Sequence, residues 1–509
     1  MQRAASGMGR WMTALALLLI AAGHARAEQA GGSRPPNIVY LYADDLGYGD
    51  LGCYGQEKIR TPRIDALAEQ GIRFTDHYSG APVCAPARAA LLTGKHTGRT
   101  FIRWNREVQP WGQWPLDAGE TTLAELLEEA GYATACIGKW GLGPPGSEGD
   151  PNARGFDLFF GYNCQRHAHT YYPEFLLRND RTIDLRAYNG LVPRRENNFL
   201  QPQVFEEMPE DPRVLYQPPF KGQVYATDLM IDEALRFIRE HREEPFFLYY
   251  ATPVPHLALQ VPHDSLEEYL ALAWDDTPYL GEHGYFPHPS PRAAYAAMIT
   301  RLDGNVGRIV DLVDELGLAE DTVIMLSSDN GATSSAQVDT EFFDSNGGLR
   351  DHKGSLYEGG IRVPMIARWK GNIEPGTTTN LPSYQPDLLP TSLELAGRQD
   401  LIPGDIDGIS FLPTLLAEPD RQEEHRYLYW EAPRGRGTQA LREGDWKLLR
   451  HGTADGGVRL ELYHLAEDPG EQHNLADEHP ERVARMVESM EEAHIPSELF
   501  PLPPALSTR

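Results

Sequence analysis

The sequence predicts an α/β protein with a large, mainly parallel sheet flanked by helices and, towards the C-terminus, a smaller antiparallel sheet with one helix. Apolar strand patterns alternate with helix patterns from residue 37 to residue 367, and this alternation is typical of a parallel sheet covered by helices. From residue 427, four short strand patterns follow one another with turns between them, which is typical of antiparallel pairing. We therefore expect a main domain over 28–420 and an α+β domain over 421–509.

The strands of the main domain are short apolar runs rich in β-branched and aromatic residues. The first run, Asn37–Tyr42, reads NIVYLY and is followed closely by two aspartates. Side chains of these types pack well on the pleated surface of a sheet. Further strands are expected at 134–137, 246–250, 322–327 and 363–367.

Helices are expected between these strands. Pro62 precedes a helical pattern at 63–70, and proline suits the first turn of a helix. The pattern at 121–130 places three leucines on one face and ends at a glycine. Two longer helices are expected at 223–241 and 292–316.

The C-terminal domain and one insertion complete the expected organisation. Its strands are expected at 427–430, 439–442, 446–450 and 459–463, and its helix at 480–494. The stretch 179–219 is Pro-rich and irregular, so we interpret it as a long surface insertion.

The chain is strongly acidic, and this excludes some partners. It has 509 residues, with 46 Lys and Arg against 74 Asp and Glu, and a net charge of −28. Hydrophobic residues make up 41%, which is enough to bury a large core. A nucleic-acid partner is not expected, because phosphate contacts need clustered Lys and Arg. Charge alone would favour a neutral or cationic partner.

The first residues are typical of an export signal. Arg3 and Arg10 make a positive start, 11–22 is an apolar run, and 25–27 reads Ala-Arg-Ala, a small-residue cleavage pattern. The alternative is an N-terminal membrane anchor, but the run is short for a span. No other segment approaches the length of a transmembrane helix. We expect a signal peptide over 1–27 and a periplasmic or secreted protein without a membrane span.

Polar residues follow two of the expected strands directly. Asp44 and Asp45 come after the first strand, and Asp329 and Asn330 after the strand at 322–327. In α/β sheets this edge carries binding sites. Three carboxylates and one amide form an oxygen-only set that suits Ca²⁺ or Mg²⁺. Each pair could instead cap a helix or form a turn. A third polar group, 303–305 (DGN), lies within a helical pattern, and we interpret it as structural.

The four cysteines are Cys53, Cys84, Cys136 and Cys164, and their spacing matches no CxxC metal pattern. In an exported protein they could form two disulfides. Cys84 stands just before Pro86, which suits the first turn of a helix. A cysteine there lies at the positive end of the helix dipole, where an anion is favoured.

Residues 84–88 (CAPAR) match the C-x-P-x-R signature of type I sulfatases. The likeness extends over nearly the whole chain after the signal segment, through motifs at 36–55, 91–94 (LLTG), 98–99 (GR), 131–141, 327–331, 353–364 and 461–476. The chain thus resembles the formylglycine-dependent, arylsulfatase-like sulfatases of the alkaline phosphatase superfamily.

The resemblance implies a sulfuric ester hydrolase in which a separate maturation enzyme oxidises Cys84 to formylglycine. The hydrated aldehyde would supply the nucleophile, and its second hydroxyl a route for sulfate release. A sulfated carbohydrate is the expected substrate, with aryl sulfates as artificial ones. The alternatives are a phosphonate or phosphate ester hydrolase of the same superfamily and an inactive protein that binds sulfated glycans.

The resemblance also implies a role for each site residue. Asp44, Asp45, Asp329 and Asn330 would hold Ca²⁺, which would also contact residue 84. Arg88 would hold the formylglycine hydrate in position. Lys139 and Lys353 would contact the sulfate, and His256 would protonate the leaving group. The alternatives for these last three are solvated lysines and a loop histidine. Such a site would concentrate positive charge on an otherwise negative surface.

One position departs from the pattern of the family. Many members read GKWHLG where this chain reads GKWGLG at 138–143, so Gly141 stands where a histidine contacts the formylglycine. We expect His167 or His169 to replace it, with packing of a substrate loop as the alternative. Other polar side chains expected near the substrate are Arg166, Tyr171, Tyr172, Arg350 and His352.

Overall fold

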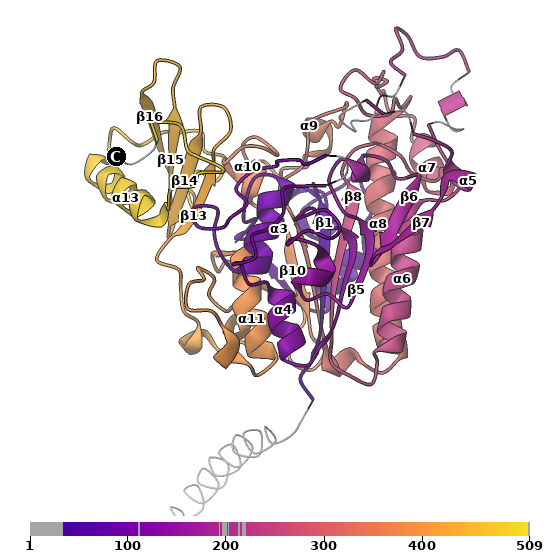
Figure 1. The fold of residues 1–509 in the computed structure, drawn as a ribbon. Helices are drawn as coiled ribbons and strands as arrows, with labels where there is room; N and C mark the ends of the chain where they lie inside the picture. Colours follow the sequence, from indigo (N-terminus) through magenta and orange to yellow (C-terminus); the bar gives the residue numbers. More distant parts are fainter. Residues whose placement is uncertain are drawn as a thin grey trace, which may run out of the picture.

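A ten-stranded sheet forms the centre of the chain in the computed structural model, and helices surround it (Figure 1). The strand order is β11-β2-β10-β9-β1-β8-β4-β5-β6-β7. Strands β9, β1, β8, β4 and β5 are parallel to one another, and β10 and β6 pair antiparallel at the two sides. The strands are β1 Asn37–Asp44, β2 Ile72–Phe74, β4 Ala133–Lys139, β5 Leu158–Tyr162, β6 Phe175–Arg178, β7 Arg181–Asp184, β8 Phe246–Pro255, β9 Thr322–Ser328, β10 Met365–Arg368 and β11 Thr377–Thr379.

The structure describes residues 34–506 apart from 110–111, 193, 196–200, 202, 212–213 and 216–219. The expected signal peptide over 1–27 therefore lies outside the described residues. Within the described part, no helix combines the length and apolar character that crossing a bilayer would need.

Helices cover both faces of the sheet because the side chains of each central strand alternate. Val39 and Leu41 of β1 belong to the core under α6 and α8, whereas Tyr40 and Tyr42 point into the core under α3, α4 and α11. The main helices are α2 Pro62–Glu69, α3 Cys84–Thr93, α4 Leu123–Glu129, α6 Ala226–Glu240, α7 His263–Leu270, α8 Pro291–Glu315 and α11 Leu388–Leu395. Shorter helices are α5 Arg186–Asn189, α9 Thr340–Phe343, α10 Glu358–Ile361 and α12 Leu412–Leu415.

A second, four-stranded antiparallel sheet stands beside the first, in the orange and yellow part of Figure 1. It consists of β13 Leu428–Ala432, β14 Thr438–Glu443, β15 Trp446–Gly452 and β16 Val458–His464. Helix α13, Pro480–Ala493, packs Met486 and Met490 on one face of this sheet. The other face packs Trp430 against Tyr78 and Tyr357 of the main part. The predicted fold class is confirmed.

The structure contains elements that were not expected from the sequence, among them strands β5 and β6 and helices α7 and α11. The main sheet also has two short strands, β2 and β11, whose sequences are not long apolar runs. A separate two-stranded sheet pairs β3 (His77–Tyr78) with β12 (Ser383–Tyr384). The stretch 179–219, expected to be irregular, contains strand β7 and helix α5 near its start. A hairpin fits there because Asn179, with φ of 52°, takes the left-handed backbone conformation that tight turns require. The domain boundary after residue 420 stays a prediction.

Buried charges hold the small sheet against the main part. Lys447 of β15 contacts Glu358 of α10 at 2.8 Å and Glu471 at 2.9 Å, and all three side chains are buried. Burial, together with the charge of Glu358, raises the pKa of Glu471 to about 7, although Lys447 opposes the shift.

The free energy of unfolding should therefore depend on Glu471 between pH 4.5 and 7. The folded protein binds the proton of the Glu471 carboxyl more tightly than the unfolded chain does. The stabilisation that this proton gives is therefore fully present below the ordinary pKa of 4.5 and is lost as the pH rises to about 7. Glu471→Gln should flatten the slope in denaturant titrations at several pH values. Glu467→Gln, at an exposed position nearby, should leave it unchanged. Parallel curves for Glu471→Gln and wild type would refute the assignment.

Candidate active site at the carboxyl edge of the sheet

The ends of four parallel strands bring the predicted polar residues together. Asp44 ends β1 and Lys139 ends β4, while Asp329 follows β9 and His256 follows β8. Parallel strands end at the same edge of a sheet, so residues far apart in the chain meet there. The backbone N–H of Asp45 donates to Oδ1 of Asp329 at 3.1 Å, which ties the ends of β1 and β9 together.

Cys84 is the first residue of helix α3, and its side chain is buried beside the carboxylates. Its Sγ lies 3.5 Å from Oδ1 of Asp44 and 3.6 Å from Nζ of Lys353. The next backbone N–H, of Ala85, donates to Oδ1 of Asn105. Burial, and then the charges of Asp329 and Asp44, raise the pKa of the Cys84 thiol well above its usual range. An unmodified thiol in this place is a weak nucleophile, because the reactive form is the thiolate.

Three cations face the three carboxylates: Arg88 and Lys139 are buried, and Lys353 is partly buried. The Arg88 guanidinium donates to Oδ2 of Asp329 at 2.9 Å and to the backbone carbonyl of Lys139. Nζ of Lys139 lies 2.5 Å from Oδ2 of Asp44. Nζ of Lys353 lies 2.6 Å from Oδ1 of Asp45. The charges at this edge thus balance, and every cation that the resemblance implied is at the site.

The carboxylates are crowded enough to repel one another. Burial, followed by the charge of Asp44, raises the pKa of Asp329 to about 7. Burial by itself would raise the pKa of Asp44. The charge of Lys139 and of the other nearby cations opposes this effect and holds the pKa well below the usual range. Two neighbouring acids whose pKa values move apart are typical of a functional site.

The oxygen atoms here fit a hard divalent cation. Oδ1 of Asn330 is buried and has no hydrogen-bond partner within the part of the chain that the structure describes. A buried acceptor without a partner costs free energy unless a ligand meets it. Ligand atoms of Asp44, Asp45, Cys84 and His256 all lie within 4.8 Å of one another. Asp44 and Asp45, together with Asp329 and Asn330, offer the carboxylate and amide oxygens that Ca²⁺ prefers.

Two histidines stack at the rim of this site. Nδ1 of His256 lies 2.6 Å from the carbonyl of Leu257, so this nitrogen donates and Nε2 faces Oδ2 of Asp45 at 3.7 Å. The ring of His169 stacks on that of His256, with 5.2 Å between centroids, and Tyr285 contacts both rings. Burial, and then nearby positive charge, hold the pKa of both histidines well below the usual range.

Other side chains expected near the substrate lie in different surroundings. His167 is buried between the rings of Tyr162 and Phe175. The remaining contacts join Arg166 with Glu107, His352 with Ser334, Arg350 with Tyr463 and Glu471, Tyr171 with the carbonyls of Pro253 and His256, and Tyr172 with Tyr225. Tyr171 thus supports the segment that carries His256.

The group at 303–305 agrees with its structural interpretation, whereas the disulfides considered for the cysteines are not formed. Asp303 lies inside α8, and its Oδ1 accepts from the backbone N–H groups of Arg63 and Ile64 at the start of α2. All four cysteines lie in the described residues, and none of them is in a disulfide.

Sequence reasoning missed Tyr285 and Gln165. Tyr285 comes from a loop without any motif. Gln165 stands two residues before His167, and its only sequence signal is its place near the end of β5.

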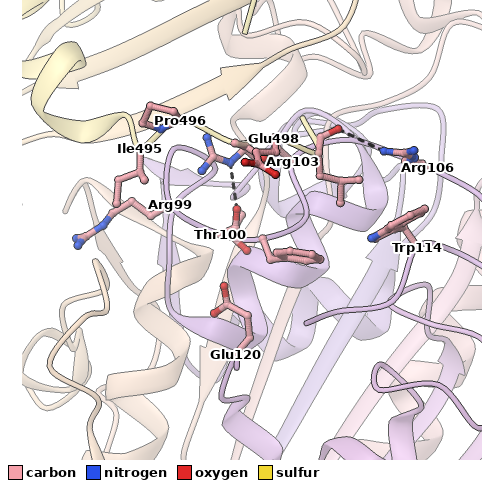
Figure 2. A pocket seen from close by; sticks show the side chains of 12 residues that line it. Arg99, Thr100, Arg103, Arg106, Trp114, Glu120, Ile495, Pro496 and Glu498 are labelled. Atoms are coloured by element: carbon pink, nitrogen blue, oxygen red, sulfur yellow. Dashed lines mark hydrogen bonds between the residues drawn. The ribbon is translucent and has the colours of Figure 1, made fainter. Parts of the chain in front are cut away.

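A cavity of about 640 Å³ lies between the loop after α3 and the segment 495–499 (Figure 2). Its arginines are already engaged. Arg99 contacts Asp407 at 2.8 Å and Arg103 contacts Glu431 at 2.7 Å, while the Arg106 guanidinium lies 4.2 Å from the ring centroid of Trp114. None of the predicted site residues lines this cavity. Its charged side chains therefore are not part of the candidate active site.

A helix-borne residue 84 beside carboxylates and buried cations, at the carboxyl edge of a mainly parallel sheet, defines a hydrolase of anionic esters. Comparison with known proteins specifies which anion. The Sulfatase family model matches residues 36–398, and the model of the C-terminal part of N-sulphoglucosamine sulphohydrolase matches 348–495. The chain belongs to the sulfatase family, the type I sulfatases of the alkaline phosphatase superfamily, and it hydrolyses sulfate esters.

Individual relatives match over most of their length. Human arylsulfatase A is 33% identical over 491 residues, which is 90% of this chain and 86% of the relative. N-acetylgalactosamine-6-O-sulfatase of Bacteroides thetaiotaomicron is 31% identical over 509 residues, which is 90% of this chain and 93% of the relative. The solved structure of Ps i-CgsB superposes with a TM-score of 0.71 at 26% identity, covering 90% of this chain and 92% of that one.

Proposed function

We propose that the protein is an exported sulfatase that removes sulfate from sulfated carbohydrates, with formylglycine at position 84 and Ca²⁺ as its cofactors. One observation carries the proposal: residue 84 lies within hydrogen-bonding reach of both a carboxylate, Asp44, and a lysine, Lys353, at an oxygen-lined site. A separate maturation enzyme would make the formylglycine. Ca²⁺ bound by Asp44, Asp45, Asp329 and Asn330 would supply a Lewis acid and lower the pKa of the attacking hydroxyl.

The charge balance of the site favours a sulfate group. Three carboxylates already offset Arg88, Lys139 and Lys353. Adding a divalent cation would leave a local excess of positive charge, which an anionic ester neutralises. This excess explains how a chain with a net charge of −28 acts on an anion. Because the excess is confined to one point, single sulfate groups on short oligosaccharides or chain ends should bind better than long, densely sulfated chains.

The roles of the three cations follow from their contacts. Arg88 bridges Asp329 and the end of β4, so it holds the floor of the site in place beside residue 84. The ammonium group of Lys139 contacts Asp44 and that of Lys353 contacts Asp45, two of the carboxylates proposed to bind the metal. When a cation occupies those carboxylates, both lysines are available to donate to sulfate oxygens.

His256 is placed to protonate the alcohol that leaves. Leu257 fixes the ring so that Nε2 faces the site. An approaching anion favours the protonated form of a neighbouring imidazole, so the substrate itself would help to load this proton. His169, stacked on His256, is the better placed of the two histidines expected to compensate for Gly141.

The proton donor can be tested by changing the leaving group. His256→Ala should lower turnover of a sulfated sugar by about 10² to 10⁴-fold, the usual contribution of a general acid. Turnover of 4-nitrophenyl sulfate should fall much less, because nitrophenolate leaves without a proton. His263→Ala, at the exposed start of α7, is the control. Equal losses on both substrates would exclude His256 as the acid.

Sulfated sugars are proposed as the substrate class because relatives such as N-acetylgalactosamine-6-O-sulfatase act on them. The N-terminal signal pattern supports a periplasmic or secreted enzyme, for which extracellular glycan fragments are accessible. A panel of sulfated mono- and oligosaccharides, with an aryl phosphate diester and a phosphonate in parallel, tests this substrate class. Activity confined to the phosphorus esters would overturn the proposal.

A further inference from the structure

Gly141 leaves a space that another side chain fills. The backbone of Gly141 has φ of 88°, in the left-handed region that favours glycine. A Cβ atom placed on this residue would lie 2.3 Å from Nε2 and 2.9 Å from Oε1 of Gln165. Such contacts are shorter than any real one, so the amide of Gln165 occupies the place where a side chain at 141 would begin.

The amide of Gln165 is buried and unsatisfied. The residue is 4% exposed, and neither Nε2 nor Oε1 has a hydrogen-bond partner among the described residues. A side-chain amide can donate two hydrogen bonds and accept two. Leaving such a group without partners costs about 1–3 kcal/mol, and a stable fold retains it where a ligand completes the bonding.

Gln165 lies on a segment that runs beside the active site. Gly141 stands two residues after Lys139, and its backbone N–H donates to the carbonyl of Asn163 at 3.2 Å. The segment after β5 therefore runs beside the segment after β4, past the residue that contacts Asp44. Four residues after Gln165 comes His169, which stacks on His256.

We propose that the side-chain amide of Gln165 is a substrate-binding group that donates a hydrogen bond from Nε2 to the sulfate. The assignment rests on the proposed function of this site. Gln165 takes the place of the histidine that Gly141 lacks, but it acts as a neutral donor. It can hold the sulfate group but cannot remove a proton from it or from the nucleophile. Proton transfer is therefore carried out by His169 and His256, the two stacked histidines.

Gln165→Met separates binding from packing. Methionine keeps the length and approximate volume of glutamine without the amide. Because it removes an unsatisfied buried group, the thermal midpoint of the matured, Ca²⁺-loaded enzyme should stay level or rise. At the same time kcat/KM for a sulfate ester should fall about 10 to 100-fold, as expected when one hydrogen bond to an anion is lost. The stabilisation of the enzyme by inorganic sulfate should shrink in parallel.

Gln439→Met is the matched control. Gln439 is equally buried, but its amide donates to Oη of Tyr429 at 2.6 Å in the small sheet. This substitution should lower the thermal midpoint and leave kcat/KM and the response to sulfate unchanged. If Gln165→Met instead behaves like Gln439→Met, Gln165 is a packing residue and the proposal is wrong.

Gln165→Glu decides the case if the methionine variant folds poorly. A carboxylate keeps the shape but repels sulfate, so this variant should lose more kcat/KM than Gln165→Met and should show no stabilisation by sulfate. Activity at or above that of the methionine variant would overturn the proposal. Wild-type enzyme that fails to cleave any sulfate ester would instead refute the proposed function, and the sulfate-induced thermal shift would still report on Gln165.

Discussion

Replacing Cys84 with alanine should abolish turnover, with a loss in kcat of about 10⁶-fold, the size seen when a catalytic nucleophile is removed. The side chain at 84 stands at the start of a helix, beside both Asp44 and Lys353. Another cysteine is not placed to take over, because among the described residues only the sulfur of Cys84 lies with the ligand atoms of Asp44, Asp45 and His256. The measurement is hydrolysis of 4-nitrophenyl sulfate by protein made in a host with the maturation enzyme.

A serine at position 84 should give a different failure. It can attack sulfur once but has no second hydroxyl with which to release the sulfate, so we expect one equivalent of product per enzyme and no further turnover. Cys136→Ser is the control, since Cys136 is also buried but points into the core under α3 and α4. Mass spectrometry of the wild-type peptide around residue 84 should show formylglycine. An unmodified thiol in active protein would refute this mechanism, as would multiple turnovers by Cys84→Ser.

Replacing Asp329 with asparagine should remove both activity and the response to calcium. Oδ1 of Asp329 accepts from the backbone of Asp45, and its Oδ2 accepts from Arg88, so the carboxylate anchors two strands and one cation at once. Without its charge, the site keeps three cations against two carboxylates and binds a divalent ion poorly. We expect kcat to fall by about 10³-fold or more, since the Lewis acid supplies several kcal/mol of transition-state stabilisation.

Chelation offers the same test without substitution. Treatment with EGTA should lower the thermal midpoint and the activity of the wild type together, and added Ca²⁺ should restore both. Asp329→Asn should show little change in its midpoint with either reagent. Asp303→Asn is the control: it weakens the start of α2, so its midpoint falls, but the response to Ca²⁺ remains. Full activity of chelated wild type would exclude a metal in the reaction.

Much of the fold was predictable because its signals are local. Each central strand is a continuous apolar run, and α4 begins with a capping box between Thr122 and Glu125. Strand β5 and the short strands towards the two sides of the sheet were not predicted. β2 has three residues and becomes a strand because β10 and β11 supply its hydrogen bonds. The hairpin β6–β7 lies at the start of a Pro-rich stretch whose composition conceals it.

The candidate site divides in the same way. Residues at the ends of strands or at the start of a helix were found from the sequence, because those positions themselves place side chains at the carboxyl edge. His167 and His169 could not be told apart, since both belong to one short turn, His167–His169. In the structure, the ring of His167 packs against Tyr162, and the ring of His169 packs against His256.

The sequence by itself determined the family, the α/β fold, the cysteine at the start of a helix, and the two polar pairs that follow strands. It also exposed the glycine at 141 as a departure, without saying what replaces the missing side chain. Only the tertiary structure decided that Gln165 fills this space and that His169 joins His256. The reason is physical: contacts between β4, the loop after β5 and the loop after β8 depend on how separate segments pack, and no local pattern in any one of them encodes that packing.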